Sequence, residues 1–191
     1  MTRFLALFLL LAAPAAAQEV QIQTSLGEID VQLDAVHAPK SVANFLRYVR
    51  EGHFDNTVIY RVVPGFVLQM GSYEANGTAR PTHEPIPLET QAAISNTRGT
   101  LSMARSSDPN SATAEFFINL DDNTAALDPK PGAAPGTTGY AVFGKVVEGM
   151  AVADQIAKVP LGGPKGPFPP DSTPALPVVI KKMVVVGDPP R

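Results

Sequence analysis

The segment that most constrains the fold is an apolar stretch at residues 59–71, IYRVVPGFVLQMG, which a Pro-Gly pair divides in two. The proline fixes φ for a turn and the glycine tolerates a positive φ, so the two halves are predicted to be short strands joined by a turn. Because side chains alternate along a strand, Ile59, Arg61 and Val63 are expected on one face of the first strand. Val67 and Gln69 are expected to share a face of the second.

Arg61 is a charged residue in an otherwise aliphatic and aromatic strand. Arginine is rarely buried without a partner, because removing its charge from water is costly. The stretch alone leaves two interpretations open. Arg61 either forms a structural salt bridge or faces a cavity.

The rest of the chain adds six apolar segments of strand length, at residues 20–24, 28–33, 101–104, 114–120, 141–146 and 178–186. Two helices are predicted. The first begins at Pro39, carries an apolar stripe at i, i+3, i+4 and i+7 from Val42 to Val49, and ends at Gly52. The second, short helix follows Met150. With no regular βα alternation, the pattern favours a mainly β fold, a closed eight-stranded antiparallel barrel with two α-helices, because closure removes exposed strand edges.

Loops are predicted at residues 72–96, 121–139 and 161–177, where glycine and proline are concentrated. Proline accounts for 19 of 191 residues, about twice the average usage of about 5%. The connections are therefore expected to be stiff.

Residues 1–17 are expected to be a secretory signal peptide, with cleavage after Ala17. Arg3 supplies a basic start, a short apolar core follows, and three alanines precede Gln18. The apolar run is shorter than the roughly 20 residues that a membrane span needs; an uncleaved anchor is the alternative interpretation. Residues 18–191 then form a single domain, expected in the periplasm, although full secretion gives the same pattern.

Composition excludes several classes of function. The chain has no cysteine, so disulfides, thiol catalysis and thiolate metal sites are absent. Its net charge is −3 and no basic patch is present, so nucleic acid is not an expected partner. His37, His53 and His83 show no metal-binding spacing, and no phosphate loop or nucleophile elbow occurs, so neither a metal nor a cofactor is expected.

Three blocks of sequence carry a resemblance to a known family. Residues 60–71 (YRVVPGFVLQMG), residues 99–105 with 111–119 (GTLSMAR and SATAEFFIN) and residues 140–150 (YAVFGKVVEGM) resemble, in order, the motifs of the cyclophilins. These are peptidyl-prolyl cis-trans isomerases that assist protein folding. The resemblance spans residues 20–187 and is strongest to bacterial exported members. It implies a monomer with a packed barrel, one helix at each end and a substrate groove on the outside.

The resemblance also implies the site residues. Arg61 is expected to donate a hydrogen bond to the prolyl nitrogen of a twisted amide, with Gln69 holding the carbonyl oxygen or the Arg61 head group. The proline ring is expected between Phe66 and Phe117, with Leu127 on the rim. Six further residues are expected to contact the proline-containing polypeptide: Val67, Ala104, Arg105, Glu115, Ala126 and Tyr140. Ala104 and Arg105 match a segment that binds substrate main chain as an added strand.

The chain departs from the family pattern at three positions. Glu115 replaces a glutamine, and its carboxylate is expected beside Arg61, where it either orients the guanidinium or competes for its donor. Competition predicts lower activity than in a Glu115→Gln variant. Ala126 lies near a position held by tryptophan, which predicts weak inhibition by cyclosporin. Tyr140 replaces a histidine found in many members.

Two other functions remain open from the sequence. The first is a catalytically weak module that binds proline-containing segments or acts as a chaperone through the same groove. The second is a barrel that binds an unrelated ligand in its interior, which the aliphatic and aromatic strands disfavour.

Overall fold

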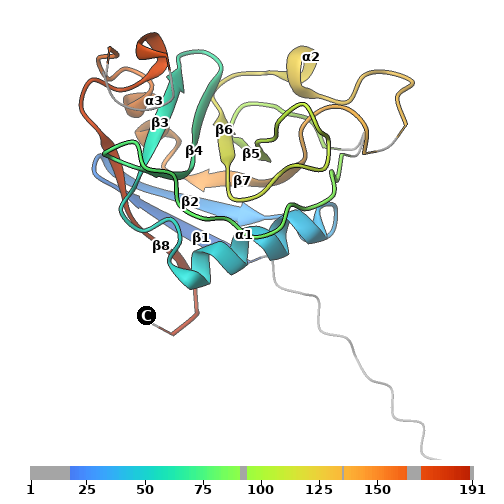
Figure 1. Ribbon diagram of the computed structural model, residues 1–191, viewed down its shortest axis with the longest axis horizontal. Helices are drawn as coiled ribbons and strands as arrows, with labels where there is room; N and C mark the ends of the chain where they lie inside the picture. Colours follow the sequence, from blue (N-terminus) through green and yellow to red (C-terminus); the bar gives the residue numbers. More distant parts are fainter. Residues whose placement is uncertain (1–17, 91–93, 135, 163–168, 190–191) are drawn as a thin grey trace, which may run out of the picture.

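The computed structural model describes residues 18–90, 94–134, 136–162 and 169–189, and the predicted signal peptide lies outside these ranges. Eight strands close into an antiparallel barrel in the order β1-β2-β7-β5-β6-β4-β3-β8 (Figure 1). The strands are β1 (Glu19–Thr24), β2 (Gly27–Leu33), β3 (Thr57–Val63), β4 (Val67–Glu74), β5 (Thr100–Met103), β6 (Phe116–Asn119), β7 (Val142–Glu148) and β8 (Val178–Val185). The predicted eight-stranded barrel is confirmed.

The barrel interior is packed with side chains. Alternate residues of β1 and β2 are buried, as expected for strands with one face toward a core. Four phenylalanines meet at the centre: Phe45, Phe54, Phe116 and Phe143. The ring of Phe45 lies 5.1 Å from that of Phe116 and 5.1 Å from that of Phe143, centroid to centroid. Aliphatic and aromatic side chains therefore fill the space that an interior ligand would need.

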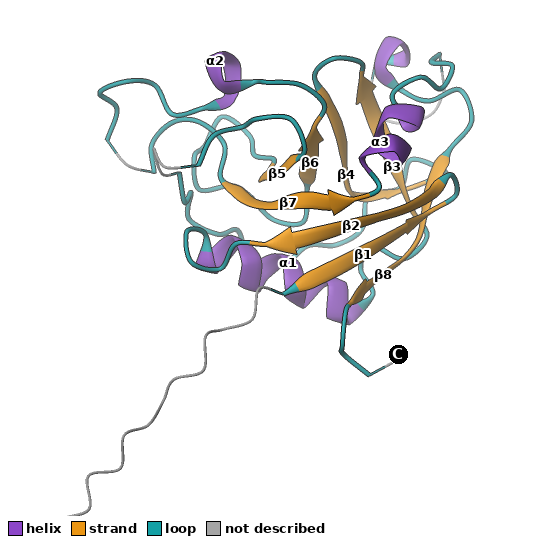
Figure 2. Cartoon of the chain, turned by 180° about the vertical axis from the view of Figure 1, so that it is seen from behind, coloured by secondary structure: helices purple, strands orange, loops and turns teal. Residues whose placement is uncertain are grey.

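Helix α1 (Pro39–Glu51) and helix α3 (Met150–Ile156) lie on opposite sides of the barrel (Figures 1 and 2). Pro39 stands in the first turn of α1, where its missing N–H costs nothing. Gly52 ends the helix with a φ of 72°, a conformation that glycine adopts without strain. Both predicted helices are confirmed.

Two short elements interrupt segments predicted as loops, helix α2 (Thr124–Leu127) and the 3-10 turn η1 (Pro170–Ser172). The prediction that residues 121–139 form a loop throughout is therefore wrong over one turn. A four-residue helix has no apolar periodicity that a sequence pattern could reveal.

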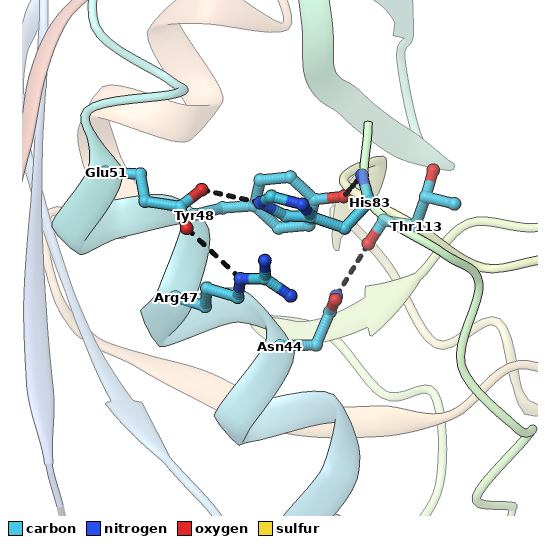
Figure 3. A network of polar contacts seen from close by, with 6 residues as sticks. All are labelled: Asn44, Arg47, Tyr48, Glu51, His83 and Thr113. Carbon is cyan, nitrogen blue, oxygen red and sulfur yellow. Dashed lines mark hydrogen bonds and ion pairs between the residues drawn. The ribbon is translucent and has the colours of Figure 1, made fainter. Parts of the chain in front are cut away.

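Polar contacts attach α1 to two distant segments (Figure 3). The His83 backbone N–H donates to the Tyr48 hydroxyl at 2.7 Å, and His83 Nε2 lies 2.6 Å from Glu51 Oε2. Asn44 Nδ2 donates to the Thr113 carbonyl at 2.6 Å. Thr113 precedes β6 by three residues, so α1 helps to position the segment that leads into this strand.

None of the helices in the described ranges has the length and apolar character needed to cross a bilayer.

Candidate active site

The turn at Pro64 and Gly65 brings the two predicted strands together as β3 and β4. Gly65 has a φ of 71°, as the sequence predicts for this position. The turn sets the register of the antiparallel pair, which places Arg61 directly opposite Gln69. Two polar side chains that are eight residues apart in the chain thereby become neighbours.

A β-bulge changes which face each residue of β3 occupies. Ile59 pairs with Met70 and Arg61 pairs with Gln69, so two residues advance on β3 while one advances on β4. Ile59 and Val62 both belong to the barrel core, whereas Arg61 is half-buried at the outer surface. The prediction that Ile59 and Arg61 share a face is therefore wrong, because a strict alternation does not include the extra residue.

Arg61 is held by a chain of hydrogen bonds. Arg61 Nη1 donates to Gln69 Oε1 at 3.1 Å, and Gln69 Nε2 donates to the Tyr60 hydroxyl at 2.6 Å. The Tyr60 hydroxyl donates in turn to Glu115 Oε2. Each group has a consistent donor or acceptor role. This series of hydrogen bonds therefore fixes the orientation of the Gln69 amide, and the amide in turn fixes that of the guanidinium.

The expected pair between Glu115 and Arg61 is not formed. No ion pair involving Arg61 occurs in the described ranges, and the Glu115 carboxylate bonds to Tyr60 instead. Competition between Glu115 and substrate for the Arg61 donor therefore has no direct contact to support it here. The hydrogen bonds that connect Glu115 to Arg61 run through Tyr60 and Gln69.

Burial perturbs both ends of the Tyr60–Glu115 contact. Burial raises the pKa of the Glu115 carboxyl, partly offset by its hydrogen bond from Tyr60. Burial also raises the pKa of Tyr60, and the neighbouring Glu115 charge raises it further. With its pKa raised in this way, Tyr60 stays a neutral donor at any ordinary pH. Glu115 Oε1 is buried and has no hydrogen-bond partner among the described residues.

A shallow pocket of about 150 Å³ lies beside the guanidinium. Its apolar wall is a small cluster separate from the barrel core, formed by Phe66, Val67, Ala104, Phe117, Leu127 and Tyr140. The Arg61 Cζ atom lies 5.9 Å from the centroid of the Phe66 ring. A permanent cation thus stands at the edge of an apolar depression that a small ring could occupy.

A second guanidinium, that of Arg105, also lines the pocket. The Arg105 Cζ atom lies 4.7 Å from the centroid of the Tyr140 ring. Tyr140 in turn packs edge-on against Phe117, with 5.6 Å between the centroids. Both arginines are among the residues that line the pocket.

Nine of the eleven predicted site residues line this one pocket: Arg61, Phe66, Val67, Gln69, Ala104, Arg105, Phe117, Leu127 and Tyr140. The other two do not. Glu115 is not among the lining residues and accepts a hydrogen bond from Tyr60. Ala126 is exposed on α2, next to Leu127, and is not among the lining residues.

Sequence reasoning missed a buried polar network behind the pocket wall. Asn123 Nδ2 donates to the Phe66 carbonyl at 2.9 Å and to Asn119 Oδ1 at 2.7 Å. Asn96 Nδ2 lies within 3.3 Å of the carbonyls of Leu127 and Tyr140. These amides fix the main chain at three positions of the wall. Their only sequence signal is their polarity, which in isolation indicates loops.

No group of three or more histidine, cysteine, aspartate or glutamate side chains that could hold a metal ion occurs in the described ranges.

Residues 19–185 match the family described as cyclophilin type peptidyl-prolyl cis-trans isomerase/CLD. The chain is 44% identical over 153 residues to a peptidyl-prolyl cis-trans isomerase of Acinetobacter baylyi, covering 80% of this chain and 79% of that protein. It is 41% identical over 174 residues to peptidyl-prolyl cis-trans isomerase A of Dickeya dadantii, covering 91% and 87%.

A solved structure shows the same fold. The crystal structure of a Cryptosporidium parvum cyclophilin type isomerase, obtained in the presence of the dipeptide Ala-Pro, superposes with a TM-score of 0.73 at 24% identity. The match covers 90% of this chain and 100% of that one. Together with the match over residues 19–185, these likenesses establish that the chain belongs to the cyclophilin-type peptidyl-prolyl cis-trans isomerases, the class of enzymes also called rotamases.

Proposed function

We propose that this chain accelerates rotation about X–Pro bonds in extracytoplasmic polypeptides, by a non-covalent mechanism in which Arg61 donates a hydrogen bond to the prolyl nitrogen. One observation carries the proposal. The Arg61 guanidinium is oriented by Gln69 at the edge of an apolar pocket and forms no ion pair in the described ranges. A donor held in this way remains available to a bound amide.

The reaction needs no covalent step. The uncatalysed barrier is about 18–20 kcal/mol, because rotation breaks the amide resonance, and rotation takes tens to hundreds of seconds. Bringing it to milliseconds requires a reduction of roughly 5–7 kcal/mol. A site achieves this when it binds the twisted amide more tightly than either planar form.

Arg61 distinguishes the two forms by the lone pair on nitrogen. In a planar amide this lone pair is delocalised and accepts hydrogen bonds poorly, whereas in the twisted amide it is localised. The guanidinium is always charged and its donors are rigidly arranged, so it offers the same donor throughout the rotation. Phe66 and Phe117 would hold the proline ring while the preceding carbonyl swings.

Substrate main chain would be held at the end of β5. The Ala104 N–H already donates to the Glu115 carbonyl at 2.9 Å, so it is committed to the barrel. An added strand would therefore bond to the carbonyl of Ala104 or to the main chain of Arg105. The sequence predicted that main-chain groups of both Ala104 and Arg105 bind substrate, and the Ala104 N–H is now removed from that set.

Export is the part of the proposal that rests on sequence alone. The basic start, apolar core and alanine triplet of residues 1–17 support a cleaved signal peptide and a periplasmic location. Amino-terminal sequencing of the protein recovered from a cell fractionation tests it. A mature chain beginning at Gln18 in the periplasmic fraction is expected, and an intact terminus in the cytoplasm would contradict it.

Exchange spectroscopy by NMR on a proline-containing peptide tests the activity. At a protein concentration far below that of the peptide, we expect exchange between the cis and trans signals that is absent without protein. Peptide binding with no exchange would instead indicate the catalytically weak binding module.

A further inference from the structure

Carboxylate partners are distributed unevenly among the arginines. Six arginine side chains lie in the described ranges, and four of them form ion pairs: Arg47 with Glu51, Arg50 with Asp188, Arg80 with Glu74, and Arg98 with Asp154. The two without an ion pair in these ranges are Arg61 and Arg105. Both line the same pocket, so positive charge is left uncompensated there and nowhere else among these six side chains.

The pocket lining contains no acidic residue that could offset the two charges. Glu115, which directly precedes β6, is not among the lining residues and accepts from the Tyr60 hydroxyl. The net charge of the whole chain is −3. The positive pocket is therefore a local feature, of the kind that selects ligands by charge rather than attracting all acidic molecules to the protein.

Arg105 is rigidly placed. Its Nε donates to the Gly139 carbonyl at 2.9 Å and its Nη1 donates to the Ser106 carbonyl at 2.9 Å. Its guanidinium also lies against the Tyr140 ring, which packs on Phe117. A side chain held by two carbonyls and an aromatic face loses little further conformational freedom when it binds an anion.

We propose that Arg105 is a specificity residue that makes the site favour polypeptides with a carboxylate side chain, aspartate or glutamate, adjacent to the proline. The proposal rests on the proposed function, because it names the substrate class of the same pocket. The Nη2 group of Arg105 is the donor nitrogen not engaged by the carbonyls of Gly139 and Ser106, and Arg105 is one of the residues that line the pocket. A side chain next to a proline seated against Phe66 and Phe117 would meet it there.

Two matched sets of short peptides test the proposal. In one set glutamate, glutamine or lysine precedes the proline, and in the other set the same residues follow it. Exchange NMR gives kcat/KM for each peptide, and titration gives its Kd, so selectivity is measured even if catalysis is absent. We expect the wild type to favour glutamate over glutamine by about three- to tenfold in one set, with lysine poorest. The preference should shrink at high salt.

Variants of Arg105 assign the preference. Arg105→Gln should bring the glutamate-to-glutamine ratio close to one, and Arg105→Lys should keep part of it because the charge remains. The ratio is informative even if a variant loses overall activity. Arg47→Gln, which makes the same charge change on the exposed face of α1, should keep the wild-type ratio.

Two results would overturn the specificity. Equal constants for glutamate and glutamine peptides in both sets would show that the pocket does not select charge. A preference that survives in Arg105→Gln would assign it to another residue. Absence of exchange with every peptide would instead refute the proposed isomerase activity, while the Kd ratios would still decide the role of Arg105.

Discussion

Arg61 acts in this account through its orientation as much as its charge. Its head group is fixed by Gln69, which Tyr60 fixes in turn. Side-chain bonds of this kind reduce the conformational freedom that binding would otherwise have to remove. Under the proposed mechanism, the site therefore begins close to the arrangement that the twisted amide requires.

Glu115 makes folding stability depend on pH. Burial raises its pKa above the ordinary 4.5, so the folded state binds the proton more tightly than the unfolded chain does. Below about pH 4.5 the carboxyl is protonated in both states, and its burial does not lower the free energy of unfolding. As the pH rises through the higher folded pKa, the buried carboxylate must become charged and the folded state loses stability. We expect Glu115→Gln to lack this loss, because its amide stays neutral and can still accept from Tyr60.

Urea unfolding of wild type and Glu115→Gln between pH 4 and pH 8 measures the difference. The variant should gain stability relative to wild type as the pH rises. Glu84→Gln, a change at an exposed glutamate, is the control. A constant difference across the range would show that the carboxyl titrates as it does in the unfolded chain.

The sequence identified most of the pocket residues because they fall in motifs that resemble a family. It did not identify how they are connected. The bulge in β3 turns Ile59 into the core and leaves Arg61 outside. The Tyr60–Glu115 contact joins residues 55 positions apart. Both depend on strand register, which local patterns do not specify.

Among the secondary-structure elements, α1 is capped by a residue far from it in sequence. Ala38, at the N-cap position, makes no side-chain cap. Glu89 supplies it instead, accepting from the N–H of Lys40 at 3.0 Å and from the N–H of Ser41 at 2.7 Å. A carboxylate here also favours the positive end of the helix dipole. The helix and the loop at residues 80–90 are therefore expected to form together.

Glu89→Ala should destabilise the fold by about 1–2 kcal/mol, the usual effect of removing a helix cap. Urea denaturation gives the free energy of unfolding. Glu84→Ala, an exposed glutamate in the same loop, is the matched control and should change it by less than about 0.5 kcal/mol. Equal effects of the two substitutions would show that Glu89 does not stabilise α1.

The strands and the two longer helices were predictable because each carries a local pattern, alternation in strands and an apolar stripe in α1. Helix α2 was not, since four residues are too few for a period. The Glu89 cap was not predictable either, because its partners are 48 and 49 residues away.

For the whole molecule, the change of folding stability with pH depends on His53 as well as on Glu115. His53 packs against Tyr48 and Phe54, and its Nε2 is buried without a hydrogen-bond partner among the described residues. Burial lowers its pKa below the ordinary 6.5, and the charge of Arg80 lowers it further. Its effect on stability is opposite in sign to that of Glu115.

Wild type should lose stability as the pH falls from about 6.5 through the lower folded pKa of His53, since the unfolded chain takes up the proton first. Thermal unfolding between pH 7.5 and pH 5 should show this loss, and His53→Gln should show less of it. His37→Gln removes a histidine that pairs with Asp34, whereas His53 packs against aromatic rings, so this variant should leave the loss of stability caused by His53 in place. The same pH dependence in His53→Gln and wild type would contradict the assignment.

Eight short strands close into a barrel with a packed interior, and the chemistry is proposed to occur in the outer pocket. The most direct test of the account is kcat/KM for cis–trans exchange of a proline peptide by wild type, Arg61→Ala and Arg61→Lys, with folding checked by thermal unfolding. We predict a loss of roughly 100-fold or more for Arg61→Ala, as for removal of one transition-state donor, and an intermediate loss for Arg61→Lys. A folded Arg61→Ala variant with wild-type kcat/KM would contradict the account.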